Sequence, residues 1–180
     1  MPCSTISCEG AAKSGYVDSA RTIEDDVRRF RAALPPVTSL TGGATHRDTL
    51  IVRFLAALQR GDTAAVRNMV LSRAEFAYLY YPESPYSRPP VQQAPALTWF
   101  LLLQESQKGI TRVFDRYSRR PLHYVRHACE ASPRADGSFR FWDRCAITYR
   151  DAGTTVTRRL FASIVERDGH FKFMSYANDF

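Results

Sequence analysis

The sequence predicts an α+β fold in which amino-terminal helices pack on a curved antiparallel sheet. Apolar residues recur with a helical period between about residues 46 and 117, and with a period of two from Leu122 onward. The β-rich runs are separated by the turn signals "PRADG", "DAG" and "RDG", and such short connections favour antiparallel hairpins. A sheet of this kind hides its apolar face under helices, which gives a layered architecture.

The chain is long enough for one well-buried core, with 180 residues of which 44% are hydrophobic. Residues 1–22 are small and polar and are expected to form a flexible tail. Residues 23–44 are expected to form a short helix and a linker, and residues 45–180 a single α+β domain. No segment approaches the roughly 18 consecutive apolar residues that a membrane-spanning helix needs.

The formal net charge of +7 comes from basic residues spread over the whole chain. A positive charge permits electrostatic binding to nucleic acid. The sequence nevertheless has no clustered Lys/Arg segment, no zinc-finger spacing and no aromatic RNA-binding signature. Nucleic acid is therefore not an expected partner.

The helical region begins with "IEDDVRRF", a short helix with its acidic residues near the favourable amino end, and "PPVTSLTGG" breaks it. The strongest helical pattern starts at His46. Gly61 is expected to end that helix, and Asp62 to cap a second helix through "TAAVRNMVL". The apolar stripe of the first of these two helices consists of Leu50, Ile51, Phe54, Leu55 and Leu58.

The segment "EFAYLYYPESPYSRPP", residues 75–90, gathers aromatic and proline residues. Its first half is predicted to pack in the core through Phe76, Leu79 and Tyr80. Proline fixes φ and removes a donor, so the second half continues neither a helix nor a strand. That second half, with Tyr86 and Arg88, is the part expected to contact a partner.

A long helix is predicted over "APALTWFLLLQESQKGITRVFDRYSRRP", with Pro121 as its stop. The sequence leaves open whether Gly109 interrupts it. Four β-rich runs follow: "LHYVRHACEAS", "SFRFWDRCAITYR", "TTVTRRLFASIVER" and "HFKFMSYANDF".

Cysteine placement suggests an oxidising compartment. Cys129 and Cys145 lie on adjacent predicted strands, where they form either a cross-strand disulfide or two buried thiols. Cys3 or Cys8 is a candidate for the lipid-bearing cysteine of an exported bacterial lipoprotein. The expected location is therefore outside the cytoplasm, periplasmic or lipid-anchored at the cell envelope, with membrane contact only through that anchor.

The phrase "LIVRFLAALQRGDTAAVRNMVL", followed by an aromatic segment, a further helix and a terminal antiparallel meander, resembles the nuclear transport factor 2-like superfamily. This superfamily includes SnoaL-like cyclases and ketosteroid isomerases. The resemblance implies that the helices and sheet form a cone with a pocket at its wide end.

Two functions follow from that resemblance. The first is a non-catalytic ligand-binding or interaction domain for a small apolar ligand or a protein partner, as a monomer or homodimer. The alternative is an isomerase-type or cyclase-type enzyme with a pocket carboxylate and tyrosine, whose catalytic residues the sequence does not identify. The pocket candidates are Phe76, Tyr80, Tyr81, Trp99, Phe100, His127, Asp143 and Tyr176.

No cofactor or metal is predicted. His123, Val125, His127 and Cys129 are predicted to share one face of the first strand after the long helix, and Asp143 and Cys145 to face them from the next strand. Such a group resembles a transition-metal site, but its spacing is unspecific and the disulfide competes for the cysteines.

Overall fold

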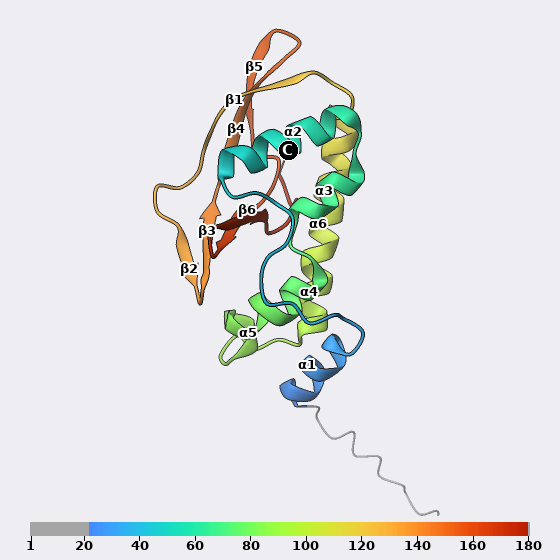
Figure 1. The fold of residues 1–180 in the computed structure, drawn as a ribbon, viewed down its shortest axis with the longest axis vertical. Helices are drawn as coiled ribbons and strands as arrows, with labels where there is room; N and C mark the ends of the chain where they lie inside the picture. The colour runs from blue at the N-terminus through green and yellow to red at the C-terminus, as the bar shows by residue number, and fades with distance from the viewer. Residues whose placement is uncertain (1–21, 180) are drawn as a thin grey trace, which may run out of the picture.

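The computed structural model describes residues 22–179 and has the α+β architecture that the sequence predicts (Figure 1). The predicted tail, with the candidate lipid-anchor residues Cys3 and Cys8, lies outside these residues apart from Thr22. The helical elements are α1 (Ile23–Arg31), α2 (Arg47–Arg60), α3 (Thr63–Met69), α4 (Arg73–Glu75), the π-helix η1 (Phe76–Tyr80), α5 (Tyr81–Glu83), the 3₁₀ turn η2 (Pro85–Ser87) and α6 (Pro95–Tyr117).

The helix boundaries follow the local signals. Gly61 adopts φ 68°, the left-handed conformation that suits glycine at a helix end, and its N–H bonds back to the last turn of α2. Asp62 then accepts the N–H of Ala65 at 2.9 Å and caps α3. The predicted tandem helices are confirmed.

Gly109 does not interrupt the long helix, because α6 is continuous over 23 residues. The residue has a packing role instead: a Cβ atom placed there would lie 1.8 Å from the carbonyl oxygen of Tyr176. Glycine at this position therefore lets the segment after the last strand lie directly on the helix.

Within the described residues, seven strands form two antiparallel sheets, one of order β1-β4-β5 and the other of order β2-β3-β6-β7. The strands are β1 (Leu122–Ala128), β2 (Arg134–Asp136), β3 (Phe139–Asp143), β4 (Ala146–Asp151), β5 (Thr154–Arg158), β6 (Ser163–Arg167) and β7 (His170–Phe173). Figure 1 shows α6 running along one side of the molecule and the strands along the other, with α2 across the β1-β4-β5 sheet.

Two of the predicted runs are each split between the two sheets. The chain leaves β3 for β4 at Arg144, which adopts φ 50°, and it leaves β5 for β6 after Arg158. The predicted "PRADG" turn is also displaced, because Arg134–Asp136 forms β2 and the reversal occurs at residues 137–138. The other two turns connect β4 to β5 and β6 to β7, as expected.

The helices and sheets enclose two hydrophobic clusters. The first joins α2 and the second half of α6 to β1 and β4, with Phe54 packed against Phe161, Phe173 and Tyr176. The second joins α1 and η1 to β3 and β6. Its central ring is Phe76, which the structure places in the core as predicted.

Cys129 and Cys145 form a disulfide with their Cα atoms 3.9 Å apart. The pairing of Ala128 with Ala146 brings the two cysteines opposite each other immediately beyond the β1-β4 ladder. The cross-strand bridge that the sequence left open is therefore present.

Candidate functional site

The predicted pocket residues do not gather around one cavity. Phe76 and Tyr80 line a cavity of about 240 Å³, which we call the inner cavity, between η1, the start of α6 and the β2-β3-β6-β7 sheet. Tyr81 contributes to a groove beside α1, His127 to a polar pocket beside α2, and Tyr176 to a groove between α3 and α6. Trp99, Phe100 and Asp143 line none of these four.

The inner cavity has an apolar wall of contacting rings. The centroid of Phe76 lies 5.9 Å from that of Tyr80 and 5.3 Å from that of Trp99. Tyr80 in turn contacts Phe141 on β3 at 5.7 Å. Trp99 therefore supports the wall from behind. The lining residues are Phe76, Tyr80, Tyr86, Gln93, Thr98, Leu101, Leu102, Arg134, Phe141, Ser163 and Met174.

A few polar groups face this apolar wall. Burial raises the pKa of the Tyr80 hydroxyl, and the negative charge of Asp136 raises it further, so the hydroxyl stays neutral. The guanidinium of Arg134 lies over the ring of Phe141, 4.1 Å from its centroid. Its Nε is 3.4 Å from the carboxylate of Asp143.

Asp143 does not line the inner cavity but contacts two residues that do. Its Oδ1 accepts a 2.6 Å hydrogen bond from the Ser163 hydroxyl, and its Oδ2 pairs with Arg134. It therefore positions two residues that line the inner cavity.

An apolar rim surrounds the opening of the inner cavity. Tyr86, from the proline-rich half of the aromatic segment, lines the cavity and is 38% exposed. On α6, Leu101 lines the cavity and is 48% exposed, and its neighbour Phe100 is 51% exposed. Phe100 thus lies outside the cavity, on a surface that an apolar ligand or partner can cover.

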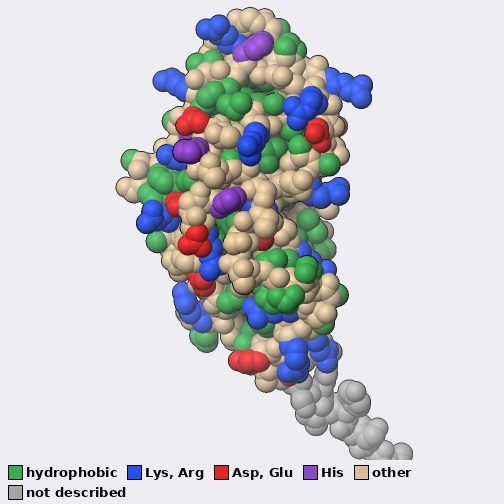
Figure 2. Space-filling model, in the orientation of Figure 1, with side chains coloured by type: hydrophobic (Ala, Val, Ile, Leu, Met, Phe, Trp, Pro, Cys, Tyr) green, Lys and Arg blue, Asp and Glu red, His purple; other side chains and the backbone are tan. Residues whose placement is uncertain are grey.

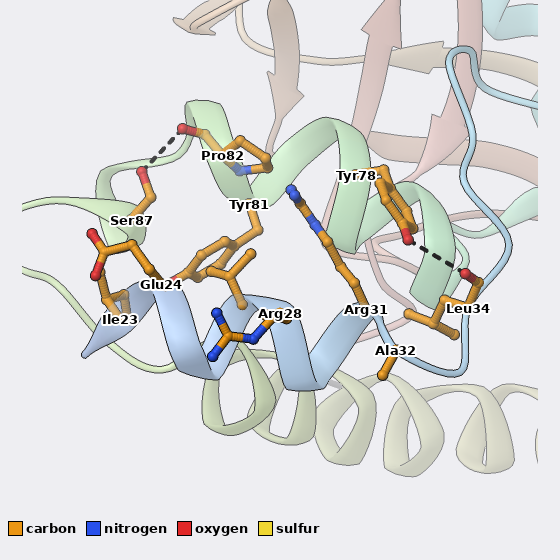
Figure 3. Close-up of a pocket in the computed structure, with 11 residues that line it drawn as sticks. Ile23, Glu24, Arg28, Arg31, Ala32, Leu34, Tyr78, Tyr81, Pro82 and Ser87 are labelled. Atoms are coloured by element: carbon orange, nitrogen blue, oxygen red, sulfur yellow. Dashed lines mark hydrogen bonds between the residues drawn. The ribbon is translucent and has the colours of Figure 1, made fainter. Parts of the chain in front are cut away.

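The groove beside α1 has a volume of about 790 Å³, larger than the inner cavity and the polar pocket, and it lies between α1 and residues 78–87 (Figure 3). Several of its polar side chains already have hydrogen-bond partners within the fold. Arg31 donates twice to the carbonyl oxygen of Ala77, at 2.8 and 3.0 Å, and Tyr78 donates to that of Leu34. The hydroxyl of Tyr81 donates to the carbonyl oxygen of Gln93 at 2.7 Å. These bonds indicate a packing seam that holds α1 in place.

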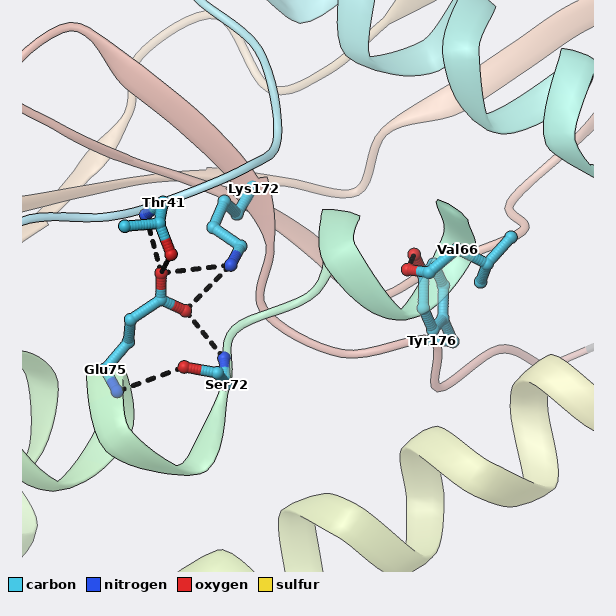
Figure 4. A network of polar contacts seen from close by, with 6 residues as sticks. All are labelled: Thr41, Val66, Ser72, Glu75, Lys172 and Tyr176. Carbon is cyan, nitrogen blue, oxygen red and sulfur yellow. Dashed lines mark hydrogen bonds and ion pairs between the residues drawn. The ribbon is translucent and has the colours of Figure 1, made fainter. Parts of the chain in front are cut away.

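The most deeply buried carboxylate, Glu75, is committed to the fold (Figure 4). Both its oxygens accept from the ammonium of Lys172, at 2.8 and 3.0 Å, and the N–H groups of Ser72 and Thr41 complete its shell. Burial opposes ionisation, but the ammonium and the two N–H groups outweigh it and lower the pKa of Glu75. Glu75 lines none of the four cavities discussed here.

Tyr176 is likewise a structural residue. Its ring stacks on Phe54, with centroids 5.4 Å apart, and its hydroxyl donates to the carbonyl oxygen of Val66 at 2.7 Å (Figure 4). Burial raises the pKa of this hydroxyl. The side chain therefore joins α3 to the segment after β7.

The polar pocket, about 520 Å³, depends on a β-bulge that the sequence did not reveal. The register of β1 against β4 shifts between Tyr124 and Arg126, so Val125 is the extra residue. The predicted shared face of His123, Val125 and His127 is therefore wrong. The bulge instead places Tyr124 on the face of His127, with its hydroxyl 2.9 Å from the His127 Nδ1.

Within residues 22–179, no group of three or more His, Cys, Asp or Glu side chains is arranged to hold a metal ion. None of the helices described there is both long and apolar enough to cross a membrane. Lys and Arg side chains are scattered over the face shown in Figure 2. No protein-family model, curated protein or solved structure matches this chain.

Proposed function

We propose that this chain is a ligand-binding domain whose inner cavity takes a small apolar molecule carrying a hydrogen-bonding oxygen. One observation carries the proposal: a cavity walled by rings, with few polar groups, opens through an exposed apolar rim. Small-molecule sites in proteins have this composition. The neutral hydroxyl of Tyr80 and the guanidinium of Arg134 are the groups that would orient the ligand.

The volume of the inner cavity limits the size of the ligand. A protein cavity of roughly 150 Å³ holds benzene. At about 240 Å³, the inner cavity suits one or two fused rings, with any further atoms lying on the rim formed by Tyr86 and Leu101.

The local backbone supports a binding role. Phe76 and Tyr80 begin and end the π-helix η1, and π-helical turns occur frequently at functional sites. The resemblance to the nuclear transport factor 2-like superfamily supports the same proposal, because its cone pocket lies between helices and sheet. Export of the domain is also part of the proposal, supported by the disulfide.

Binding without catalysis is the better supported of the two functions. An isomerase mechanism needs a carboxylate in the cavity, and no acidic residue lines the inner cavity. Asp136 and Asp143 act on Tyr80, Arg134 and Ser163 from behind the wall.

A titration with 2-naphthol tests the proposal, because this probe combines two fused rings with one hydroxyl. We expect saturable binding by calorimetry. Leu101→Trp should abolish it by filling the entrance, whereas Leu97→Trp, equally exposed on the same helix but outside the cavity, should not. Tyr80→Phe keeps the ring and removes the hydroxyl, so affinity should fall by roughly two- to tenfold.

Unaltered binding to Leu101→Trp, or equal loss in Leu97→Trp, would contradict the assignment of the inner cavity. Absence of binding by 2-naphthol, together with no small molecule in native mass spectra of the purified protein, would contradict the proposed function.

A further inference from the structure

The polar pocket contains a histidine whose orientation is fixed from one side. Nδ1 of His127 lies 2.9 Å from the hydroxyl of Tyr124 and 3.2 Å from Oδ1 of Asp48. The Tyr124 hydroxyl donates to that same carboxylate oxygen. Asp48 comes from the first turn of α2 and Tyr124 from β1, so a helix and a strand hold the imidazole between them.

These contacts determine which ring nitrogen carries the proton. The hydrogen bond from Tyr124 is the main cause of the lowered pKa of Asp48, so the carboxylate is ionised and acts only as an acceptor. The single hydroxyl proton of Tyr124 points to Asp48, which leaves oxygen lone pairs facing Nδ1 of His127. The neutral imidazole therefore carries its proton on Nδ1 and a lone pair on Nε2.

The side chain of His127 is only 9% exposed, yet its Nε2 makes no hydrogen bond to any residue among those described. It lines the polar pocket. Nε2 is thus a lone-pair acceptor at the pocket that no described residue occupies, and it can accept from a ligand that supplies a proton donor.

The same pocket holds a cationic group, whose charge acts on His127. The guanidinium of Arg47 rests on the indole of Trp142, 3.7 Å from the ring centroid, and makes no hydrogen bond or ion pair with another described residue. Stacking leaves its N–H edges free, and those edges match the two oxygens of a carboxylate. Arg47 lines the same pocket as His127.

We propose that the polar pocket binds a small 2-hydroxycarboxylate, with the carboxylate on Arg47 and the hydroxyl donating to Nε2 of His127. This site is separate from the inner cavity and shares none of its lining residues. Asp48 and Tyr124 are positioning residues, because they act on the ligand through His127.

Lactate and propionate are the matched probes, since they differ only in the hydroxyl. Titrations of the whole chain, followed by the ring resonances of His127 and by calorimetry, should show that lactate binds about three- to tenfold more tightly. Arg47→Gln should weaken both ligands by about tenfold or more, because a charge-assisted bidentate contact is lost. Arg150→Gln, an exposed arginine on the same sheet, is the control for net charge.

His127→Phe should bring lactate down to the affinity of propionate and leave propionate unchanged. If that variant does not fold, a comparison of the two ligands at different pH values on the unaltered protein tests the same contact. Burial lowers the pKa of His127, so its neutral form prevails at pH 7. The other ionisable groups that line the pocket are Arg47, Asp48, Tyr124, Arg126 and Glu130. Acidification through that pKa protonates Nε2, which then donates to the hydroxyl instead of accepting from it, so the ratio of the lactate and propionate affinities should change.

Equal affinities for lactate and propionate at pH 7 would overturn the proposal, as would equal losses in Arg47→Gln and Arg150→Gln. A preference for lactate that survives in His127→Phe would also overturn it. None of these results bears on naphthol binding in the inner cavity, so the two proposals fail independently.

Discussion

The buried ion pair between Glu75 and Lys172 makes the sharpest prediction about stability. The side chains are 1% and 3% exposed, and the two residues are 97 positions apart. Lys172→Met retains most of the apolar volume of the lysine chain but removes the ammonium. Glu75 is then left buried, with the N–H groups of Ser72 and Thr41 as its main donors.

The expected loss in free energy of unfolding is about 3–5 kcal/mol at pH 7, the usual cost of leaving one buried charge without its partner. For a chain of this size each kcal/mol corresponds to roughly 2–4 °C in melting temperature. Lys172→Met should therefore melt about 6–20 °C lower. The double variant Lys172→Met/Glu75→Gln should recover much of this, because no buried charge remains and the amide oxygen can still accept one N–H.

The pH dependence gives an independent check. In the unaltered protein the pKa of Glu75 is lowered below its ordinary 4.5, so its contribution is present above that pH and is lost on acidification through the folded-state pKa. In Lys172→Met burial raises the pKa of Glu75 instead. The variant's deficit should then be largest at neutral pH and shrink on acidification as the carboxyl group protonates.

Urea denaturation followed by circular dichroism at pH 7 and pH 5, for the single and double variants, measures these differences. A loss below about 1 kcal/mol in Lys172→Met would refute the reasoning, as would a double variant that is no more stable than the single one.

Three further outcomes are expected. Gly109→Ala should lower the free energy of unfolding by about 1–3 kcal/mol despite the better helix propensity of alanine, because the new methyl group meets the Tyr176 backbone. Urea denaturation measures this loss, and it should be absent in Gln107→Ala, an exposed position on the same helix. Removing the Cys129–Cys145 disulfide, which spans 16 positions, should cost about 3 kcal/mol, measured by denaturation of the double alanine variant, and equal stability would contradict this. Ending the chain at His170 deletes most of β7 and should give insoluble protein, whereas a soluble product that melts cooperatively would contradict the role of that strand.

Local signals in the sequence predicted much of the fold. The boundary between α2 and α3 follows from Gly61 and Asp62, whose preferences act within a few residues of chain. The disulfide was one of two outcomes that the sequence left open, because the two cysteines lie on neighbouring predicted strands. Phe76 and Tyr80 were pocket candidates through the superfamily resemblance, and the structure places both on the inner cavity.

The polar pocket could be predicted less well from the sequence. His127 was a candidate, but its partners were not, because a period-two pattern assigns Tyr124 to the opposite face. The bulge at Val125 reverses that assignment, and Asp48 joins from a helix 76 positions away from Tyr124. A single extra residue in a strand leaves no clear mark in the hydrophobic pattern.

The sequence by itself determined the helices, the antiparallel strands and the residues suited to the core, since periodicity, caps and turns act over short distances. Only the tertiary structure decided that the carbonyl group of Tyr176 packs directly against Gly109, and that Glu75 pairs with Lys172. It also decided that the aromatic segment lines a cavity. Those features arise where segments far apart in the chain meet. Their free energy comes from burial and close contact, which no local pattern encodes.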